Sequence, residues 1–172
     1  MKKYDELSKC STYTIDQKKV EKYIFNILKN IAIDIVKGTS IKFGSIIVLG
    51  NLLKSYQNTN GFIQMKPKKN PIKSVVMIDT EDGANIIKTF SKPPYDGAII
   101  VDKNGQILSV GMYLVIDRPD LSIPDECGTR HKAAASFSLR NDVISVLTLS
   151  EETNTIRIWK DGISKKTLKI NK

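Results

Sequence analysis

Residues 95–116 read YDGAIIVDKNGQILSVGMYLVI, and two apolar, β-branched runs in this segment, 98–102 and 106–116, flank the pair Asn104-Gly105. Short apolar runs that are rich in Val and Ile favour β-strands. An Asn-Gly pair between two such runs favours a hairpin turn whose two central residues both tolerate positive φ. The segment therefore predicts two antiparallel strands joined by a tight turn.

Further segments of the same composition occur along the chain. Those predicted as strands are SIIVLG (45–50), SVVMID (74–79), VISVLTLS (143–150) and TIRIW (155–159). The pair Asp161-Gly162 repeats the hairpin signal near the C-terminus. Short helices are expected between the strands, at 84–90 and 129–139. Strands interleaved with helices, with hairpins among them, indicate an α/β fold of α+β-like character, with a central mixed β-sheet flanked by helices.

An amphipathic helix of about six turns is predicted before the first strand. Thr14-Ile15-Asp16-Gln17 has the pattern of a capping box, in which the Thr14 hydroxyl accepts a hydrogen bond from the Gln17 amide. Lys37-Gly38 provides a stop signal. The apolar residues that recur at helical spacing are Val20, Ile24, Ile27, Leu28, Ile31 and Ile35. We therefore expect an N-terminal helical extension, residues 1–40, followed by the main domain, residues 41–172.

The composition sets the class of protein. The 172 residues include 27 Lys+Arg and 18 Asp+Glu, which gives a net charge of +9, and 41% are hydrophobic. This length suits one domain with a real core. The longest uncharged stretch, 104–116, is thirteen residues, shorter than the roughly eighteen that a membrane span needs. The basic N-terminus has no apolar run behind it, so no signal peptide is expected. Two cysteines, Cys10 and Cys127, form no disulfide or zinc framework, and a cytoplasmic location is expected.

Two lysine-rich segments, 66–73 and 160–172, carry much of the positive charge. Such segments can attract nucleic acid, an anionic membrane or a polyphosphate ligand. No aromatic residues are interleaved with these lysines, so the stacking platforms of a single-strand binder are missing. A solvated surface is therefore the favoured interpretation, and a nucleic-acid partner is not expected.

Several enzyme classes are excluded by what the sequence lacks. There is no GxxxxGK[ST] motif for a P-loop, and GSIIVLG (44–50) has too few glycines for a dinucleotide fingerprint. His131 is the only histidine, so no histidine pair can bind zinc. Neither cysteine has the partner expected in a thiol protease.

Two short segments carry residues suited to nucleotide chemistry. In Tyr95-Asp96-Gly97-Ala98, a carboxylate at the start of a strand can hold a divalent metal, and the two small residues let a phosphate approach the backbone. Taken alone, this segment is more often an ordinary Asp-Gly turn. In 128–132, GTRHK, a glycine, a hydroxyl and an arginine begin a helix, where free amides and the dipole favour an anion. Arg130 adds a bidentate donor for phosphate oxygens, although a solvated basic turn is the alternative.

In combination, YDGAIIVDKNGQILSVGMYL (95–114), GTRHKAA (128–134) and LTLSEET (147–153) resemble the diadenylate cyclase domain. The signature of that family pairs DGA with GTRHRAA, and here DGA stands at 96–98. The resemblance runs from about Gly44 to Lys160. The order and the spacing of the motifs both agree with the family.

The resemblance implies a role for each matching position. The residues that it implies in catalysis are Asp96, Arg130 and His131. The metal ligands that it implies are Asp96 and Glu152. The residues that it implies in nucleotide binding are Gly97, Ala98, Tyr113, Leu114, Gly128, Thr129, Lys132, Ser150 and Glu151. One departure is Lys132, which keeps the charge of the family's second arginine and loses its planar fork.

The resemblance also implies the reaction. Family members condense two ATP into cyclic di-AMP and release two pyrophosphates, with Mg²⁺ or Mn²⁺ as cofactor. One set of motifs per chain implies a homo-oligomer in which two chains meet face to face. The alternatives are a non-catalytic nucleotide-binding module and a basic nucleic-acid-binding domain.

Overall fold

The computed structural model of the chain describes residues 15–56, 61–118, 120–125 and 127–172. Among these residues, one sheet has the strand order β2-β4-β3-β1-β5-β6-β7. Strands β1 and β3 are parallel, and every other neighbouring pair is antiparallel. The strands are β1 (Ser45–Gly50), β2 (Phe62–Gln64), β3 (Ala98–Asp102), β4 (Ile107–Leu114), β5 (Val143–Leu149), β6 (Thr155–Lys160) and β7 (Ile163–Lys169). The predicted mixed sheet flanked by helices is confirmed.

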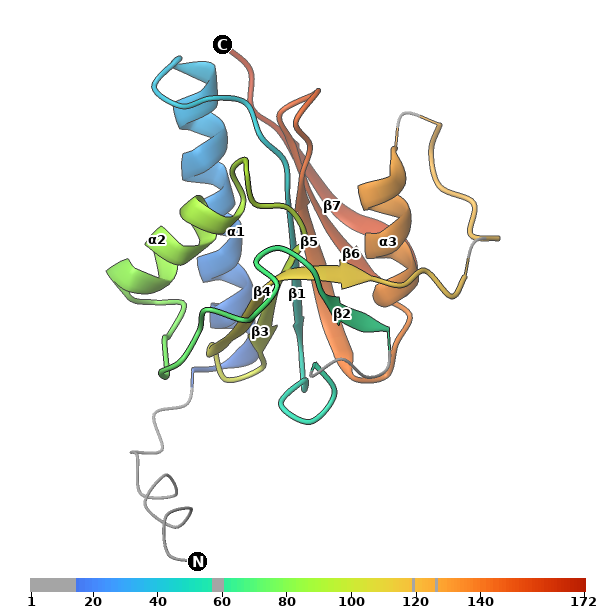
Figure 1. The fold of residues 1–172 in the computed structure, drawn as a ribbon. Coiled ribbons are helices and arrows are strands. Elements are labelled where there is room, and N and C mark those ends of the chain that lie inside the picture. The colour runs from blue at the N-terminus through green and yellow to red at the C-terminus, as the bar shows by residue number, and fades with distance from the viewer. Residues whose placement is uncertain (1–14, 57–60, 119, 126) are drawn as a thin grey trace, which may run out of the picture.

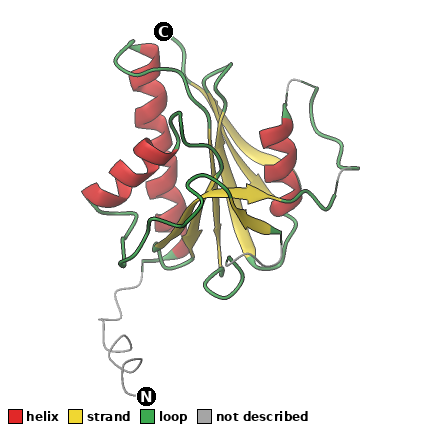
Figure 2. Ribbon diagram, viewed as in Figure 1, coloured by secondary structure: helices red, strands yellow, loops and turns green. Residues whose placement is uncertain are grey.

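Helices cover both faces of the sheet, which makes three layers (Figures 1 and 2). Helices α1 (Gln17–Val36) and α2 (Glu81–Phe90) lie on one face, and α3 (Thr129–Phe137) lies on the other. The predicted helices at 84–90 and 129–139 thus correspond to α2 and α3. Among the described residues, no helix has the length and apolar character needed to cross a lipid bilayer.

The core is split by the sheet because successive side chains of a strand point to opposite faces. In β1, Ile47 and Leu49 join the cluster under α1, whereas Ile46 and Val48 join the cluster under α3. Strands with two buried faces appear in the sequence as continuous apolar runs. This is why β1 and β3 could be located from composition.

Helix α1 packs directly on the sheet. Its buried residues Val20, Ile24 and Leu28 belong to the same cluster as the strands. The N-cap is Asp16, whose side chain accepts a hydrogen bond from the Lys18 amide at 3.0 Å. The predicted cap residue Thr14 lies outside the described residues. The predicted stop is confirmed, since Lys37 is the C-cap and Gly38 has φ +73°.

The two predicted hairpins are both present, but their turns differ. At Asp161-Gly162, between β6 and β7, both residues have positive φ, +53° and +77°, as a two-residue turn of type I′ requires. At Asn104-Gly105 only the glycine has positive φ, +90°, and the amide of Asp102 donates to the Gln106 carbonyl. That loop therefore has three residues, and the expected pair of positive φ angles is wrong there.

Three segments depart from the predicted pattern. Residues 74–79 form no strand, only a single bridge between Met77 and Gln106, because the backbone of Met77 and Ile78 packs against Gly83 in the first turn of α2. Strand β2 has only three residues and gives little signal. Strand β7, ISKKTLK, is mostly exposed at the edge of the sheet, so its lysines conceal the alternation.

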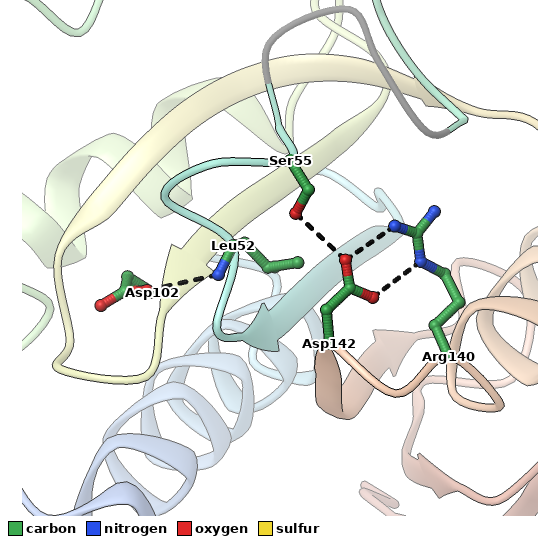
Figure 3. A network of polar contacts seen from close by, with 5 residues as sticks. All are labelled: Leu52, Ser55, Asp102, Arg140 and Asp142. Atoms are coloured by element: carbon green, nitrogen blue, oxygen red, sulfur yellow. Dashed lines mark hydrogen bonds and ion pairs between the residues drawn. The ribbon is translucent and has the colours of Figure 1, made fainter.

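A polar network ties the end of β1 to the segment after α3 (Figure 3). The Arg140 guanidinium binds the Asp142 carboxylate through both oxygens, at 2.9 and 2.8 Å, and the Ser55 hydroxyl donates to the same carboxylate at 3.0 Å. Nearby, the buried Asp102 carboxylate accepts from the Leu52 amide at 3.4 Å. These contacts fix the loop after β1 without the help of regular secondary structure.

Candidate functional site

A cleft with a volume of about 250 Å³ opens beside the N-terminal end of α3. Its walls are mostly apolar and come from β1, β3, β4 and α3. The apolar lining includes Ile46, Ala98, Met112, Leu114, Ile116 and Ala133. The two charged residues among its described lining are Asp96 and Arg130. An apolar slot with two opposite charges at its wall suits a ligand that has a flat ring and an anionic tail.

Asp96 lies at the entrance to β3. Its side chain is exposed, and its Oδ1 accepts a hydrogen bond from the Gly97 amide at 2.8 Å. Gly97 has φ +113°, and a β-carbon there would lie 2.8–2.9 Å from the backbone of Gly111 and Met112. Only glycine fits such a close approach between chain segments. The DGA segment is therefore held against β4, and its carboxylate faces the cleft.

Helix α3 presents its N-terminus to the same region. Its N-cap is Gly128, which provides no side-chain acceptor for the first amides, and its first turn contains no acidic residue. Unsatisfied amides at a helix start attract anions, and the Arg130 guanidinium adds a fixed charge. The first turn is therefore suited to an anion, and its role in binding phosphate stays a prediction.

Gly44 is a site residue that sequence reasoning missed. A β-carbon on Gly44 would overlap Nη1 and Cζ of Arg130. The guanidinium therefore lies directly against the backbone just before β1. No motif marks this glycine, since the close approach joins two segments that are 86 residues apart in the sequence. The only available signal was the place of Gly44 immediately before a buried strand.

Two further hollows adjoin the cleft and share Arg130 with it. One, of about 230 Å³, is lined by Gly128, Thr129, Arg130, His131, Ser150, Glu151 and Glu152. The other, of about 260 Å³, includes Gly44, Asp96, Arg130 and Glu151. The structure thus brings the DGA segment, the helix start and the turn after β5 around one guanidinium. Three motifs that are far apart in the sequence form one continuous concave site.

His131 is a buried residue that also lines the hollow formed with Ser150, Glu151 and Glu152. Only 6% of its surface is exposed, and its ring centroid lies 5.8 Å from that of Trp159. The Trp159 indole donates to the Thr148 hydroxyl at 3.0 Å, which fixes the ring against β5. Packing against Trp159 therefore holds the His131 side chain in place where it lines the hollow.

Lys132 lies apart from the other predicted site residues. It lines a separate hollow of about 190 Å³ formed with Cys127 and the segment 121–125. Cys127 is buried, and Cys10 lies outside the described residues. Each step along a helix rotates the side chain by about 100°, so Lys132, two residues on, points about 200° away from Arg130. This rotation explains why Arg130 faces the cleft while Lys132 does not.

The carboxylates near the cleft are few but suitably placed for a divalent cation. Asp96 and Glu151 line one hollow, and Glu152 lines its neighbour. Among the described residues, no group of three His, Cys, Asp or Glu side chains forms a ready-made metal cage. Mg²⁺ is commonly held by one or two carboxylates together with substrate phosphates. The donor set therefore fits a cation that arrives with a nucleotide.

The fold and this concave site characterise a nucleotide-binding domain of a known family. The model of the family described as "DisA bacterial checkpoint controller nucleotide-binding" matches residues 31–164. The chain belongs to this diadenylate cyclase family, and the resemblance inferred from DGA and GTRHKAA is confirmed.

Named relatives agree with this assignment. A diadenylate cyclase of Methanocaldococcus jannaschii is 34% identical over 119 residues, which cover 69% of this chain and 36% of that protein. The cyclic di-AMP synthase CdaA of Bacillus subtilis is 37% identical over 70 residues, covering 41% of this chain and 24% of that one. The matches thus span about a third or less of these relatives' own length.

Solved structures share the fold. DacA from Staphylococcus aureus superposes with a TM-score of 0.53 at 22% identity, covering 89% of this chain and 87% of that one. A protein of Bacillus cereus described as a hypothetical membrane spanning protein superposes with a TM-score of 0.59 at 22% identity, covering 88% and 63%. At this level of identity the likeness concerns the fold.

Proposed function

We propose that this chain is a diadenylate cyclase that condenses two ATP molecules into cyclic di-AMP and releases two pyrophosphates. One observation carries the proposal: Arg130, seated on Gly44, lines the cleft together with Asp96 and also lines the hollow formed with Ser150. The Arg130 guanidinium thus borders both the apolar cleft, which has room for a ring, and the N-terminal end of α3, which is suited to an anion. Family membership supports the same activity.

The adenine would occupy the apolar cleft. Tyr113, half exposed, offers a ring for stacking, and the buried Leu114 adds apolar surface to the lining. Burial of a base between such side chains supplies affinity with little dependence on hydrogen bonds. The backbone of β4 beside Gly97 and Ala98 then sets the position of the ribose.

The triphosphate would extend from the cleft toward the start of α3. Gly128 and Thr129 place backbone amides there, and Ser150 with Glu151 forms the opposite wall of the hollow. Arg130 would bind phosphate oxygens and stabilise the negative charge that develops on them during transfer. His131, fixed against Trp159, completes that wall. Lys132, which lines a different hollow, would contribute positive potential rather than a direct contact.

Each chemical step is an adenylyl transfer. The 3′-oxygen of one ATP attacks the α-phosphorus of the other, a new P–O bond forms, and the bond to the pyrophosphate oxygen breaks. The hydroxyl proton is released, pyrophosphate leaves, and the same exchange in the opposite sense closes the ring. Such transfers depend on positioning and charge neutralisation more than on covalent catalysis.

Asp96 and Glu152 would hold the Mg²⁺ or Mn²⁺ that we propose as cofactor. The cation supplies positive charge at the phosphates and lowers the pKa of a bound hydroxyl. The exposure of Asp96 and its place on the same cleft as Arg130 fit this role.

The reaction requires two nucleotide sites, and the described residues contain one set of motifs. We therefore propose that two chains meet face to face and each present one ATP to the other. A twofold arrangement makes each nucleotide both donor and acceptor. The exposure of Asp96 and Tyr113 leaves them accessible to a second chain.

The test is direct. Purified protein is incubated with ATP and either Mg²⁺ or Mn²⁺, and cyclic di-AMP is sought by mass spectrometry, with Arg130→Ala as the control for a contaminating enzyme. We expect product from the wild type and loss of product from the variant. ATP binding without product, over a range of protein concentrations and with either metal, would favour the non-catalytic module. Tight, salt-sensitive binding of DNA or RNA without product would favour the nucleic-acid-binding alternative.

A further inference from the structure

A further hollow, of about 410 Å³, lies beside β2 and β4 and is lined by three lysines from the segment 65–73. The uncharged part of its lining is Tyr56, Gln64, Asn70, Ser109 and Met112. No carboxylate belongs to its described lining. It shares only Met112 with the cleft that contains Asp96 and Arg130. The hollow is therefore a separate, strongly basic site rather than an extension of that cleft.

The segment that carries the lysines is fixed to the sheet by side-chain amides. Strand β2 pairs with β4 only from Met112 to Leu114, which leaves the earlier carbonyls of β4 without a strand partner on that side. The Gln64 amide donates to the Val110 carbonyl at 2.9 Å and to the Pro67 carbonyl at 2.7 Å. The Asn70 amide donates to the Leu108 carbonyl at 2.7 Å. These bonds cover the exposed edge of β4 and anchor the segment on both sides of Lys68 and Lys69.

Backbone contacts hold the same segment. The amides of Met65 and Lys66 donate to the Gly111 carbonyl at 3.0 and 3.2 Å. A β-carbon on Gly111, which has φ +70°, would overlap the Lys66 carbonyl. The segment therefore lies closer to β4 than any other residue type at position 111 would allow. Its lysines project from an ordered frame, which lowers the entropic cost of binding.

The charge on this frame is not neutralised within the described part of the chain. The ion pairs there involve other cations, namely Arg118, Arg140, Lys160 and Lys165. Lys68, Lys69 and Lys73 are exposed and have no carboxylate partner among the described residues. Three like charges around one hollow repel one another, and an anion between them removes that repulsion.

We propose that this hollow binds an oligophosphate anion, a chain of two or more phosphates. Its volume of about 410 Å³ is more than ten times the ~30 Å³ that one water occupies, which is enough for a chain of several phosphate groups. Three ammonium groups can each contact a different phosphate oxygen. Gln64, Asn70 and Ser109 also line the hollow, and their hydrogen bonds to β4 and to one another hold the lining in place. Such an anion could be free pyrophosphate or the phosphate tail of a nucleoside triphosphate, and the test separates these sources.

The experiment measures anion binding in the Arg130→Ala variant, whose cleft lacks the guanidinium group. Pyrophosphate and, separately, ATP are titrated into Arg130→Ala protein by calorimetry, without divalent metal and at about 0.1 M salt, where the Debye length is about 10 Å. The same titrations are made on this protein with Lys68→Ala, Lys69→Ala and Lys73→Ala added. The matched control carries Lys19→Ala, Lys22→Ala and Lys29→Ala, which remove the same charge from the exposed side of α1.

We expect one saturable site for pyrophosphate, weakened roughly tenfold by the three changes at 68, 69 and 73. The control triple is expected to change the affinity less than about twofold, since charges beyond a Debye length are largely screened. Tighter binding of ATP than of pyrophosphate at this site would assign it to a nucleoside polyphosphate, and equal or weaker binding of ATP would assign it to the free anion.

Three outcomes would overturn the proposal. The first is the absence of a saturable pyrophosphate site in Arg130→Ala protein. The second is an equal loss of pyrophosphate affinity in both triple variants. The third is binding of a single-stranded oligonucleotide that the changes at 68, 69 and 73 weaken and that pyrophosphate does not displace. Because the titrations detect binding and need no turnover, they are independent of whether the protein makes cyclic di-AMP. Thermal unfolding of each triple verifies that these exposed substitutions leave the fold intact.

Discussion

The Arg130 guanidinium lies against the backbone of Gly44, so close that a β-carbon on this glycine would overlap the guanidinium nitrogen. Gly44 immediately precedes β1, and Arg130 is in the first turn of α3. The contact therefore sets where the guanidinium stands relative to the sheet, whose strands β1, β3 and β4 line the cleft. Ordering a long, flexible arginine side chain costs up to about 2 kcal/mol of rotamer entropy, which the contacts at this site must offset.

The first prediction follows from this contact. Gly44→Ala should displace the guanidinium and lower kcat/KM for cyclic di-AMP formation by roughly a hundredfold, because small misplacements of a positioning group are costly. Steady-state kinetics with Mn²⁺ or Mg²⁺ measure the effect. If Gly44 acts through Arg130, adding Gly44→Ala to Arg130→Ala should cause little further loss. A full additional loss in the double variant would place the role of Gly44 elsewhere.

Asp96 provides the second prediction. Asp96→Asn should lower product formation by about a hundredfold or more, since it removes the charge proposed to hold the metal. The fold should be unaffected, because the asparagine Oδ1 can still accept from the Gly97 amide and the side chain is exposed. Asp161→Asn, at an exposed turn away from the cleft, is the matched control and should retain activity. Full turnover by Asp96→Asn would reject the metal-binding assignment.

Tyr113 provides the third prediction. Tyr113→Ala should weaken ATP binding about fivefold, which corresponds to ~1 kcal/mol of lost stacking. Its cross-strand neighbour Ile63 is the control, because both side chains are 50% exposed and only Tyr113 lines the cleft. Ile63→Ala should leave the affinity unchanged, and Tyr113→Phe should retain it. Equal effects of the two alanine variants in a calorimetric titration would show that Tyr113 does not stack on the base.

The strands that composition alone predicted share one property, burial on both faces. Strands β1 and β3 are fully buried, so their composition alone identified them. The segment 74–79 has a similar composition and is coil, because the Met77 and Ile78 backbone packs against Gly83 of α2 instead of pairing along a strand. An apolar, β-branched composition therefore indicates that part of a segment is buried, and a segment such as 74–79, in which Ile78 is buried, need not form a strand.

The site was predictable where a motif is contiguous and unpredictable where it joins distant segments. DGA and GTRH named Asp96 and Arg130, and the structure places both on one cleft. Gly44 was missed because its role depends on an approach that only the folded chain creates. Lys132 belongs to the same contiguous motif, yet the helical rotation directs it to another hollow.

The fourth prediction concerns stability and pH. The hydrogen bonds from Arg140 hold the pKa of Asp142 below its usual value, and the Ser55 hydroxyl acts in the same direction (Figure 3). Because the folded-state pKa is lowered, the stabilisation is complete above the unfolded pKa of about 3.9 and is lost as the pH falls through the folded value. Asp142→Asn should therefore lower the free energy of unfolding by ~1 kcal/mol at pH 7. The difference from the wild type should shrink below about pH 4.

Urea denaturation of both proteins at several pH values measures this difference. The comparison variant is Asp120→Asn, whose partner Arg118 is exposed, and it should change stability little at neutral pH because solvent screens such pairs. A difference between wild type and Asp142→Asn that stays constant from neutral to acidic pH would mean that Asp142 contributes through packing rather than through its charge.

The last prediction is that a single chain does not complete the reaction. The described residues provide one DGA segment and one α3 start, whereas cyclic di-AMP joins two nucleotides that each act as donor and acceptor. At saturating ATP and metal, the specific activity should therefore fall on dilution, over the concentration range in which active pairs dissociate. Mixing Asp96→Asn with Arg130→Ala protein adds a second test. If each transfer step needs both residues at one nucleotide, pairs of the two variants should be inactive. When wild-type protein is mixed with either variant, activity should fall more steeply than the fraction of wild-type chains. Constant specific activity down to concentrations where light scattering detects only monomer would refute the two-chain site.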